Sequence, residues 1–111
     1  MKVEITLHDE FKRQFRRLKK KYHSLTDDLE TLQQEIMADP FQGVSLGGGV
    51  RKIRMAIGSK GKGRSGGARV LTLTVLVSEN ADVTLLTIYD KEEIDNVSDN
   101  YIKWLVSEAQ K

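Results

Sequence analysis

The sequence predicts an α+β domain whose elements follow the order β-α-α-β-β-β-α. Three observations support this prediction. Apolar and polar residues alternate near the start of the chain, two segments with helical periodicity follow, and the second half is rich in β-branched residues before a last helical segment. Strands are expected at residues 2–7, 50–57, 69–77 and 83–89, and helices at residues 9–22, 24–39 and 98–109.

The length and composition indicate one domain, residues 1–111. A chain of 111 residues buries about two-thirds of its unfolded surface, which is enough for a core without disulfides. It has no cysteine, which fits a reducing compartment. No apolar run is long enough to cross a bilayer and no apolar signal segment is present near the start. We therefore expect a soluble, cytoplasmic protein without a membrane partner.

The two helical segments after the first strand are expected to form an αα-hairpin that covers a sheet. Phe11, Phe15, Leu18 and Tyr22 make one apolar stripe on the first helix, and Ser24 or Thr26 caps the second, which Asp39-Pro40 ends. The first helix also carries a run of cations within residues 12–21. These indicate either a surface that faces RNA or a solvated helix back, and the sequence leaves both open.

The strand at residues 50–57 is expected to present two cations side by side. Ile53, Met55 and Ile57 share one face, so Lys52 and Arg54 share the other, roughly 7 Å apart along the strand. Such a pair is unusual for packing and suits the binding of a phosphate. The next strand, residues 69–77, is apolar on both faces, which is typical of a central strand, and a turn is expected at residues 79–82.

Residues 43–68 form a glycine-rich, basic stretch around that strand. They hold all nine glycines, and no acidic residue occurs between Asp39 and Glu79, so the cations have no neutralising neighbours in the sequence. Residues 43–49 are expected to be a loop and residues 58–67 a mobile flap. The pattern favours a polyanion site, although a solvated hairpin loop is the plainer alternative. The candidate RNA-binding residues are Arg51, Lys60, Lys62 and Arg64.

The net charge of +2 is modest, but the charges are segregated along the chain. Acidic residues collect at residues 27–35 and 90–99, away from the cations. Segregation of this kind can focus an electrostatic field on one face of a protein. The acidic run at residues 90–99 suggests self-shielding of the basic cluster.

Three motifs make the chain resemble a known family. They are RKIR at residues 51–54, GKGRSGGARV at residues 61–70 and LLTIYDK at residues 85–91. Together with the order of elements they resemble the RelE/ParE superfamily of bacterial toxins, most closely its HigB-type branch, over nearly the whole chain. The resemblance implies a RelE-like fold and a ribosome-dependent mRNA interferase, an endoribonuclease without metal or cofactor. It also implies a cognate antitoxin, encoded beside the toxin, and contacts with mRNA and rRNA in the ribosomal A site.

The resemblance also implies which residues do the chemistry. Lys52 and Arg54 match the paired cations of the second predicted strand, Arg69 the arginine that opens the third, and Lys91 the cation after the fourth. Cleavage through the 2′-OH needs a base, an acid and positively charged groups that stabilise the pentacovalent phosphate. Like charge disfavours the ammonium form of a lysine, which makes Lys52 the candidate base. Arg54 and Arg69 would hold the phosphate, and Lys91 would stabilise charge or donate the proton.

A tyrosine near the leaving group occurs in some relatives. Tyr89, at a strand end beside Lys91, is the preferred candidate and could stack on a base, whereas Tyr101 lies on the apolar stripe of the last helix. His8 and His23 are expected to be capping or exposed residues, and Trp104 to be buried in the packing of the last helix. No cluster of residues has the spacing of metal ligands.

Two rival functions are compatible with the same expected fold. Relatives of the ParE type poison DNA gyrase without cutting RNA, and a catalytically inactive member could bind RNA through the glycine-rich loop. The set Lys52, Arg54, Arg69 and Lys91 separates these alternatives, because an interferase needs it and a gyrase poison does not.

Overall fold

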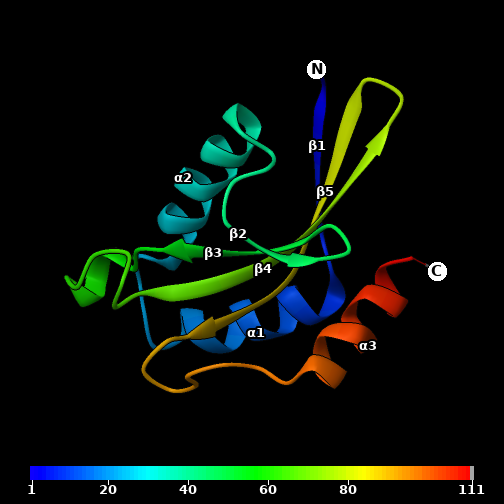
Figure 1. Ribbon diagram of the computed structural model, residues 1–111. Coiled ribbons are helices and arrows are strands. Elements are labelled where there is room, and N and C mark those ends of the chain that lie inside the picture. The colour runs from blue at the N-terminus through cyan, green and yellow to red at the C-terminus, as the bar shows by residue number, and fades with distance from the viewer. Residues whose placement is uncertain (111) are drawn as a thin grey trace.

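A five-stranded mixed sheet with helices on both faces forms the protein (Figure 1). The computed structural model describes residues 1–110. In chain order the elements are β1 (Val3–Leu7), α1 (Asp9–Lys19), α2 (Leu25–Ala38), β2 (Val44–Gly47), β3 (Val50–Met55), a 3₁₀ turn (Gly58–Lys60), β4 (Ala68–Val77), β5 (Asn80–Asp90) and α3 (Asp99–Ala109).

The sheet has the order β1-β5-β4-β3-β2, and only β1 and β5 run parallel. The strands β2 to β5 form an antiparallel meander, so the predicted α+β class and its helical hairpin are confirmed. The sequence prediction missed β2, which lies inside the segment expected to be a loop. All four residues of β2 are exposed, so burial leaves no alternating pattern there. The strand exists because it pairs with β3, with an irregular register after Ser45.

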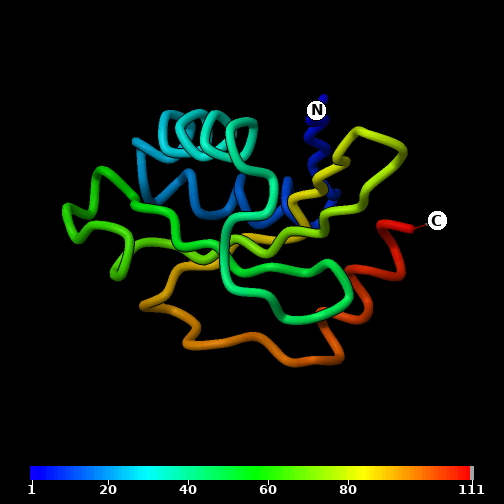
Figure 2. The backbone as a smooth tube through the Cα atoms, turned by 45° about the horizontal axis from the view of Figure 1, so that its top comes forward, coloured from blue at the N-terminus to red at the C-terminus, as the bar shows by residue number. Residues whose placement is uncertain are grey.

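The core consists of two apolar clusters, one on each face of the sheet. Figure 2 shows α1 and α2 on one side, and α3 with the chain that leads to it on the other. The first cluster joins the helical hairpin to residues such as Ile53, Val70 and Ile88. The second joins α3 to Leu71 and Leu73. Strand β4 is therefore covered on both faces, as predicted, over residues 68–74.

The far end of the β4–β5 hairpin extends beyond β2 and β3, with β1 beside it (Figure 1). Val75, Leu76 and Val77 are exposed there. The turn is shorter than predicted and consists of Ser78 and Glu79, and Ser78 adopts a positive φ of 56°. The predicted turn at residues 79–82 was too long because Asn80 to Asp82 pair with β4 instead.

Side chains cap the N-termini of two of the three α-helices in the described residues. His8 caps α1 by accepting the N–H of Glu10 at Nδ1, and Ser98 caps α3 by accepting the N–H of Tyr101. Ser24 precedes α2 without a side-chain cap. Its hydroxyl instead accepts the N–H of Ser59, which attaches the 3₁₀ turn to the start of α2.

Trp104 is not buried, contrary to the sequence prediction. It is 47% exposed, stacks on Tyr101 with ring centroids 6.0 Å apart, and contacts the edge of His8. The reason is that α3 packs on the sheet through Leu105, which is fully buried, and the next residue toward the N-terminus faces outward. No helix in residues 1–110 is both long and apolar enough to cross a membrane.

Candidate functional site

Strand register brings four of the five predicted catalytic residues to one face of the sheet. Arg54 lies opposite Arg69 in the β3–β4 ladder, and Arg69 lies opposite Tyr89 in the β4–β5 ladder. Residues that pair directly point to the same face, so these three form a row across the sheet. Lys52 is two residues from Arg54 and shares that face. It is the face that α3 covers.

Lys52 and Arg54 differ in their contacts. The Lys52 side chain is half-buried, and its Nζ donates to Asn96 Oδ1 at 3.2 Å. Arg54 is exposed and makes no hydrogen bond or ion pair with any residue in the described part of the chain. Its guanidinium therefore keeps all its donors open to a ligand.

Lys91 reaches the same region from the end of β5. Residues 91–98, here called the strap, connect β5 to α3. The Nζ of Lys91 forms an ion pair with Asp95 in the strap. The hydrogen bond and charge of Lys91, and more weakly the charge of Lys52, hold the pKa of Asp95 below its usual value. Both lysines thus lie close to one carboxylate.

Arg69 is buried and binds main-chain oxygens. It is 6% exposed, and its guanidinium donates to the carbonyls of Arg64 and Ala68 at 3.2 Å and of Ser65 at 3.0 Å. The family resemblance implied that Arg69 holds the phosphate. In the structure, Arg69 anchors the end of the glycine-rich loop (residues 58–67) and leaves a positive charge beneath the site.

Tyr89 is 2% exposed, and its hydroxyl is buried without a hydrogen-bond partner among the described residues. Burial raises the pKa of Tyr89, and the nearby charge of Arg69 partly opposes that rise. Its ring packs in the cluster beneath α3.

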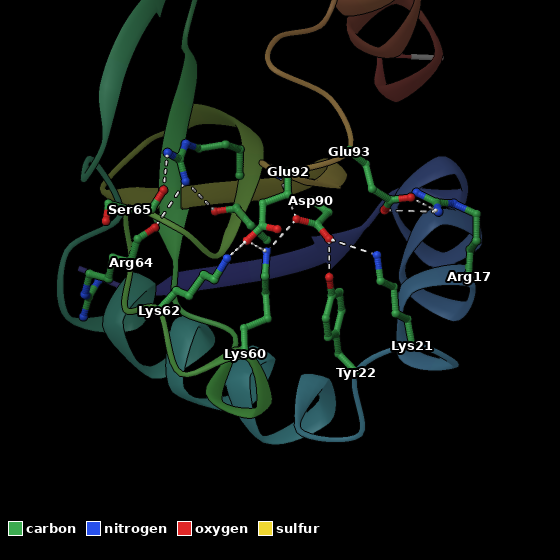
Figure 3. A network of polar contacts seen from close by, with 12 residues as sticks. Arg17, Lys21, Tyr22, Lys60, Lys62, Arg64, Ser65, Asp90, Glu92 and Glu93 are labelled. Atoms are coloured by element: carbon green, nitrogen blue, oxygen red, sulfur yellow. Dashed lines mark hydrogen bonds and ion pairs between the residues drawn. The ribbon is translucent and has the colours of Figure 1, made fainter.

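The cations of the glycine-rich loop pair with acids that are distant in the sequence, and Figure 3 shows the pairs of Lys60 and Lys62. Lys60 Nζ lies 2.8 Å from Asp90 Oδ1, Lys62 Nζ lies 2.7 Å from Glu92 Oε1, and Arg64 contacts Glu35. Folding therefore supplies the neutralising partners that the sequence around the loop lacks. Arg51, the remaining predicted RNA-binding residue, lies over the ring of Phe41 at 5.3 Å.

Asp90 is the centre of this network and was missed by the sequence analysis. It is fully buried and accepts hydrogen bonds from Lys60 Nζ, Tyr22 Oη and the N–H of Glu92 (Figure 3). Burial acts to raise the pKa of Asp90, but these hydrogen bonds outweigh it and hold the pKa below its usual value. The only signal in the sequence was an acid ending an apolar strand.

The glycine-rich loop is consequently attached at several points, in contrast to the mobile flap expected from its composition. Lys60 joins it to Asp90, Arg69 holds its last turn, and the N–H of Lys91 donates to Gly67 O at 3.1 Å. Gly67 fits because a Cβ there would lie 2.2 Å from the carbonyl oxygen of Met55. Close approach of two backbones explains this glycine better than ligand binding does.

A second polar cluster joins α3 to α1 and the sheet. Tyr101 Oη donates to Glu10 Oε2 at 2.5 Å and bonds Thr87 Oγ1 at 2.9 Å. Arg13 holds both carboxylate oxygens of Glu10, at 2.8 and 2.9 Å. Burial, and then the hydrogen bond to Glu10, raise the pKa of Tyr101 to about 12. Tyr101 is therefore a neutral donor that fixes α3 beside the site.

A groove of about 620 Å³ opens next to Lys52, between the β2–β3 hairpin and α3. It is lined by apolar residues, among them Val50 and Ile102, and by polar ones, among them Lys52, Asn96 and Lys103. This volume accommodates a nucleotide. Within residues 1–110, no group of three or more His, Cys, Asp or Glu side chains is placed to hold a metal ion.

The fold and the site define a class of small α+β proteins in which lysine and arginine side chains from neighbouring strands form the candidate site. Residues 9–111 match the family described as the RelE toxin of the RelE / RelB toxin-antitoxin system. The chain belongs to this family of toxins, and the family implies an antitoxin partner. The sequence resemblance to the RelE/ParE superfamily is thereby confirmed, while the HigB-type branch stays a prediction.

Proposed function

We propose that the protein is a ribosome-dependent mRNA endoribonuclease that acts in the cytoplasm. One observation supports this most directly: the β3–β4–β5 register aligns Lys52, Arg54 and Arg69 on one sheet face, beside a groove large enough for a nucleotide. Clustered cations from separate strands suit a transition state with a dianionic phosphate.

The proposed reaction is attack of the substrate's own 2′-OH on the adjacent phosphorus. The amine of Lys52 takes the 2′-OH proton, the O2′–P bond forms, and the P–O5′ bond breaks. The ammonium of Lys91 gives a proton to the departing 5′ oxygen. The products are a 2′,3′-cyclic phosphate and a 5′-OH, and because these groups supply both proton transfers the reaction needs no metal.

Arg54 is the group best suited to hold the phosphate oxygens, because its forked donors have no competing partner in residues 1–110. Arg69 contributes positive charge from below the site while it keeps the glycine-rich loop in place. Tyr89 supports the floor of the site, next to Arg69 in the ladder. These assignments follow the family resemblance of the motifs, and the strand register and the chemistry of the groups support them.

Two sets of cations are available to contact RNA outside the site. The side chains of Lys62 and Arg64 are more than half exposed, so they can exchange a carboxylate for a phosphate, whereas Lys60 is buried and acts through the loop. The outer face of α1 and its C-cap offer exposed cations that have no partner within the described residues, namely Lys12, Arg16, Lys19 and Lys20. We propose that this face contacts rRNA and that the ribosome positions the mRNA.

Expression in cells, with and without the neighbouring open reading frame, tests the proposal. Growth arrest that the neighbour relieves, with mRNA cut on translating ribosomes, is the expected result. Lys52→Ala should abolish cleavage, and Lys2→Ala, which removes the same charge at an exposed site away from the groove, should not. Gyrase inhibition, or RNA binding without cleavage, would replace the proposal with one of the two rival functions.

Salt dependence gives a second test. Binding through phosphate contacts releases counterions, so affinity for ribosomes or RNA should fall steeply between low and moderate salt. Affinity that does not change with salt would contradict a binding mode based on the basic surface.

A further inference from the structure

The two lysines of the proposed site contact adjacent residues of the strap, and these two residues differ in charge. Lys91 Nζ pairs with the carboxylate of Asp95. Lys52 Nζ donates to the neutral amide oxygen of Asn96 at 3.2 Å. The same oxygen accepts the N–H of Val97 at 3.0 Å, which fixes the orientation of the amide.

A carboxylate and an amide have different effects on a neighbouring ammonium group. The full negative charge of a carboxylate stabilises the protonated lysine, whereas an amide oxygen offers only a dipole. The strap therefore places a full negative charge beside Lys91 Nζ and a neutral acceptor beside Lys52 Nζ. A proton donor and a proton acceptor need different surroundings of this kind.

The other groups that face Lys52 do not reverse this difference. Its partners in the ladders, Val44 on β2 and Leu71 on β4, carry no charge. Arg54 shares its strand face, and Asp95 acts on it from the strap. On α3, one acid and one base, Asp99 and Lys103, line the same groove. The charges around Lys52 are thus balanced in sign, and Asn96 is its hydrogen-bonded neighbour.

We propose that Asn96 is a positioning residue that holds Lys52 Nζ in place to act as the base without a charged partner, while Asp95 holds Lys91 Nζ in place to act as the acid. The inference rests on the proposed endoribonuclease function and assigns the two proton transfers within it. The 2′-OH proton moves to the Lys52 amine, and the Lys91 ammonium supplies the proton to the 5′ oxygen. Exchange with water restores both lysines after release of the products.

The pH profile of mRNA cleavage tests the inference with a matched set of variants. Asn96→Asp places a carboxylate beside Lys52 in nearly the same shape. In this variant the pH range over which kcat rises should move to higher pH by about one unit. Its kcat should be about tenfold lower than that of the wild type near neutral pH and should recover at high pH. Asn96→Ala should lower kcat several-fold at every pH with little change in KM. A role in folding alone would lower the melting temperature without moving the profile of Asn96→Asp.

The exchange variant Asp95→Asn/Asn96→Asp keeps the composition of the strap and swaps the two partners. It should lose more kcat than either single variant, because the carboxylate then pairs with the base and the neutral amide with the acid. Equal activity of the exchange variant and the wild type would overturn the inference.

A readout without catalysis separates failure of this inference from failure of the proposed function. NMR of labelled lysine side chains, assigned with Lys52→Arg and Lys91→Arg, should show that Asn96→Ala changes the Nζ signal of Lys52 and leaves that of Lys91 in place. Asp95→Asn should do the reverse. If the wild type cuts no mRNA, the proposed function fails and these spectra still decide the inference. A Lys52 signal that neither Asn96→Ala nor Asn96→Asp changes would overturn it.

Discussion

Arg54 and Arg69 face each other across the β3–β4 ladder, two like charges on one face of the sheet. A pair of like charges directly opposite in a sheet is destabilising. The two side chains respond differently: Arg69 turns to three main-chain carbonyls, and Arg54 extends into solvent. One arginine therefore has a structural role, and the other is available to a ligand.

Replacing Arg54 should separate activity from stability. Arg54→Ala removes an exposed side chain without an ion pair in the described residues, so the free energy of unfolding should stay within about 0.5 kcal/mol of the wild type. Cleavage should fall about 10²-fold because the phosphate loses its forked donor. Urea denaturation and single-turnover cleavage on ribosomes measure the two quantities. A large loss of stability with normal cleavage would contradict this assignment.

Replacing Arg69 should instead reduce stability. Lysine cannot reach three carbonyls with the planar geometry of a guanidinium, so Arg69→Lys should lower the free energy of unfolding by about 2 kcal/mol. Arg54→Lys is the matched control and should leave stability unchanged. Hydrogen exchange should also show faster opening of residues 61–67 in Arg69→Lys alone. Equal effects of the two variants would show that the loop does not depend on Arg69.

Asp90→Asn should be among the most destabilising single substitutions. It removes one partner of a buried ion pair and leaves Lys60 with Glu92 alone, so we expect a loss of about 3 kcal/mol. The double variant Asp90→Asn/Lys60→Met should recover part of that loss, because no buried charge then lacks its partner. Chemical denaturation of the four proteins of this cycle gives the coupling energy, and a coupling near zero would contradict the prediction.

The same carboxylate predicts sensitivity to acid. The pKa of Asp90 is lower in the folded protein than its usual value of 3.8. Its stabilising effect is therefore present above that value and lost as the pH falls through it toward the folded pKa. Denaturation midpoints measured from pH 6 to pH 3 should fall more steeply in the wild type than in Asp90→Asn.

Tyr101 predicts that stability is lost as the pH rises in the alkaline range, whereas Asp90 predicts a loss as the pH falls. Its folded pKa is about 12, raised from 10.0, so its contribution is complete below pH 10 and is lost as the pH rises from 10 to 12. Tyr101→Phe should lower stability at neutral pH by about 1 kcal/mol through loss of the bond to Glu10. As the pH rises above 10, this variant should also lose less stability than the wild type. A parallel decline in both proteins would assign the alkaline sensitivity to other groups.

Periodicity made most of the fold predictable. The stripe of Phe11, Phe15 and Leu18 and the alternation around Ile53 identified helix and strand because burial on one face imposes a period on the sequence. Strand β2 and the exposure of Trp104 were predicted wrongly because no period imposed by burial identifies them. An exposed edge strand leaves no such period, and the orientation of α3 depends on which side chain, Leu105 or Trp104, meets the sheet.

The sequence by itself determined the α+β class, the shared strand face of Lys52 and Arg54, and membership of the toxin family through its motifs. Only the tertiary structure decided which cations are free: Asp90, Glu92 and Glu35 pair with the glycine-rich loop, and the strap residues Asp95 and Asn96 contact the two lysines. The physical reason is that strand parity is a local property, whereas an ion pair depends on which distant segments folding brings within about 4 Å.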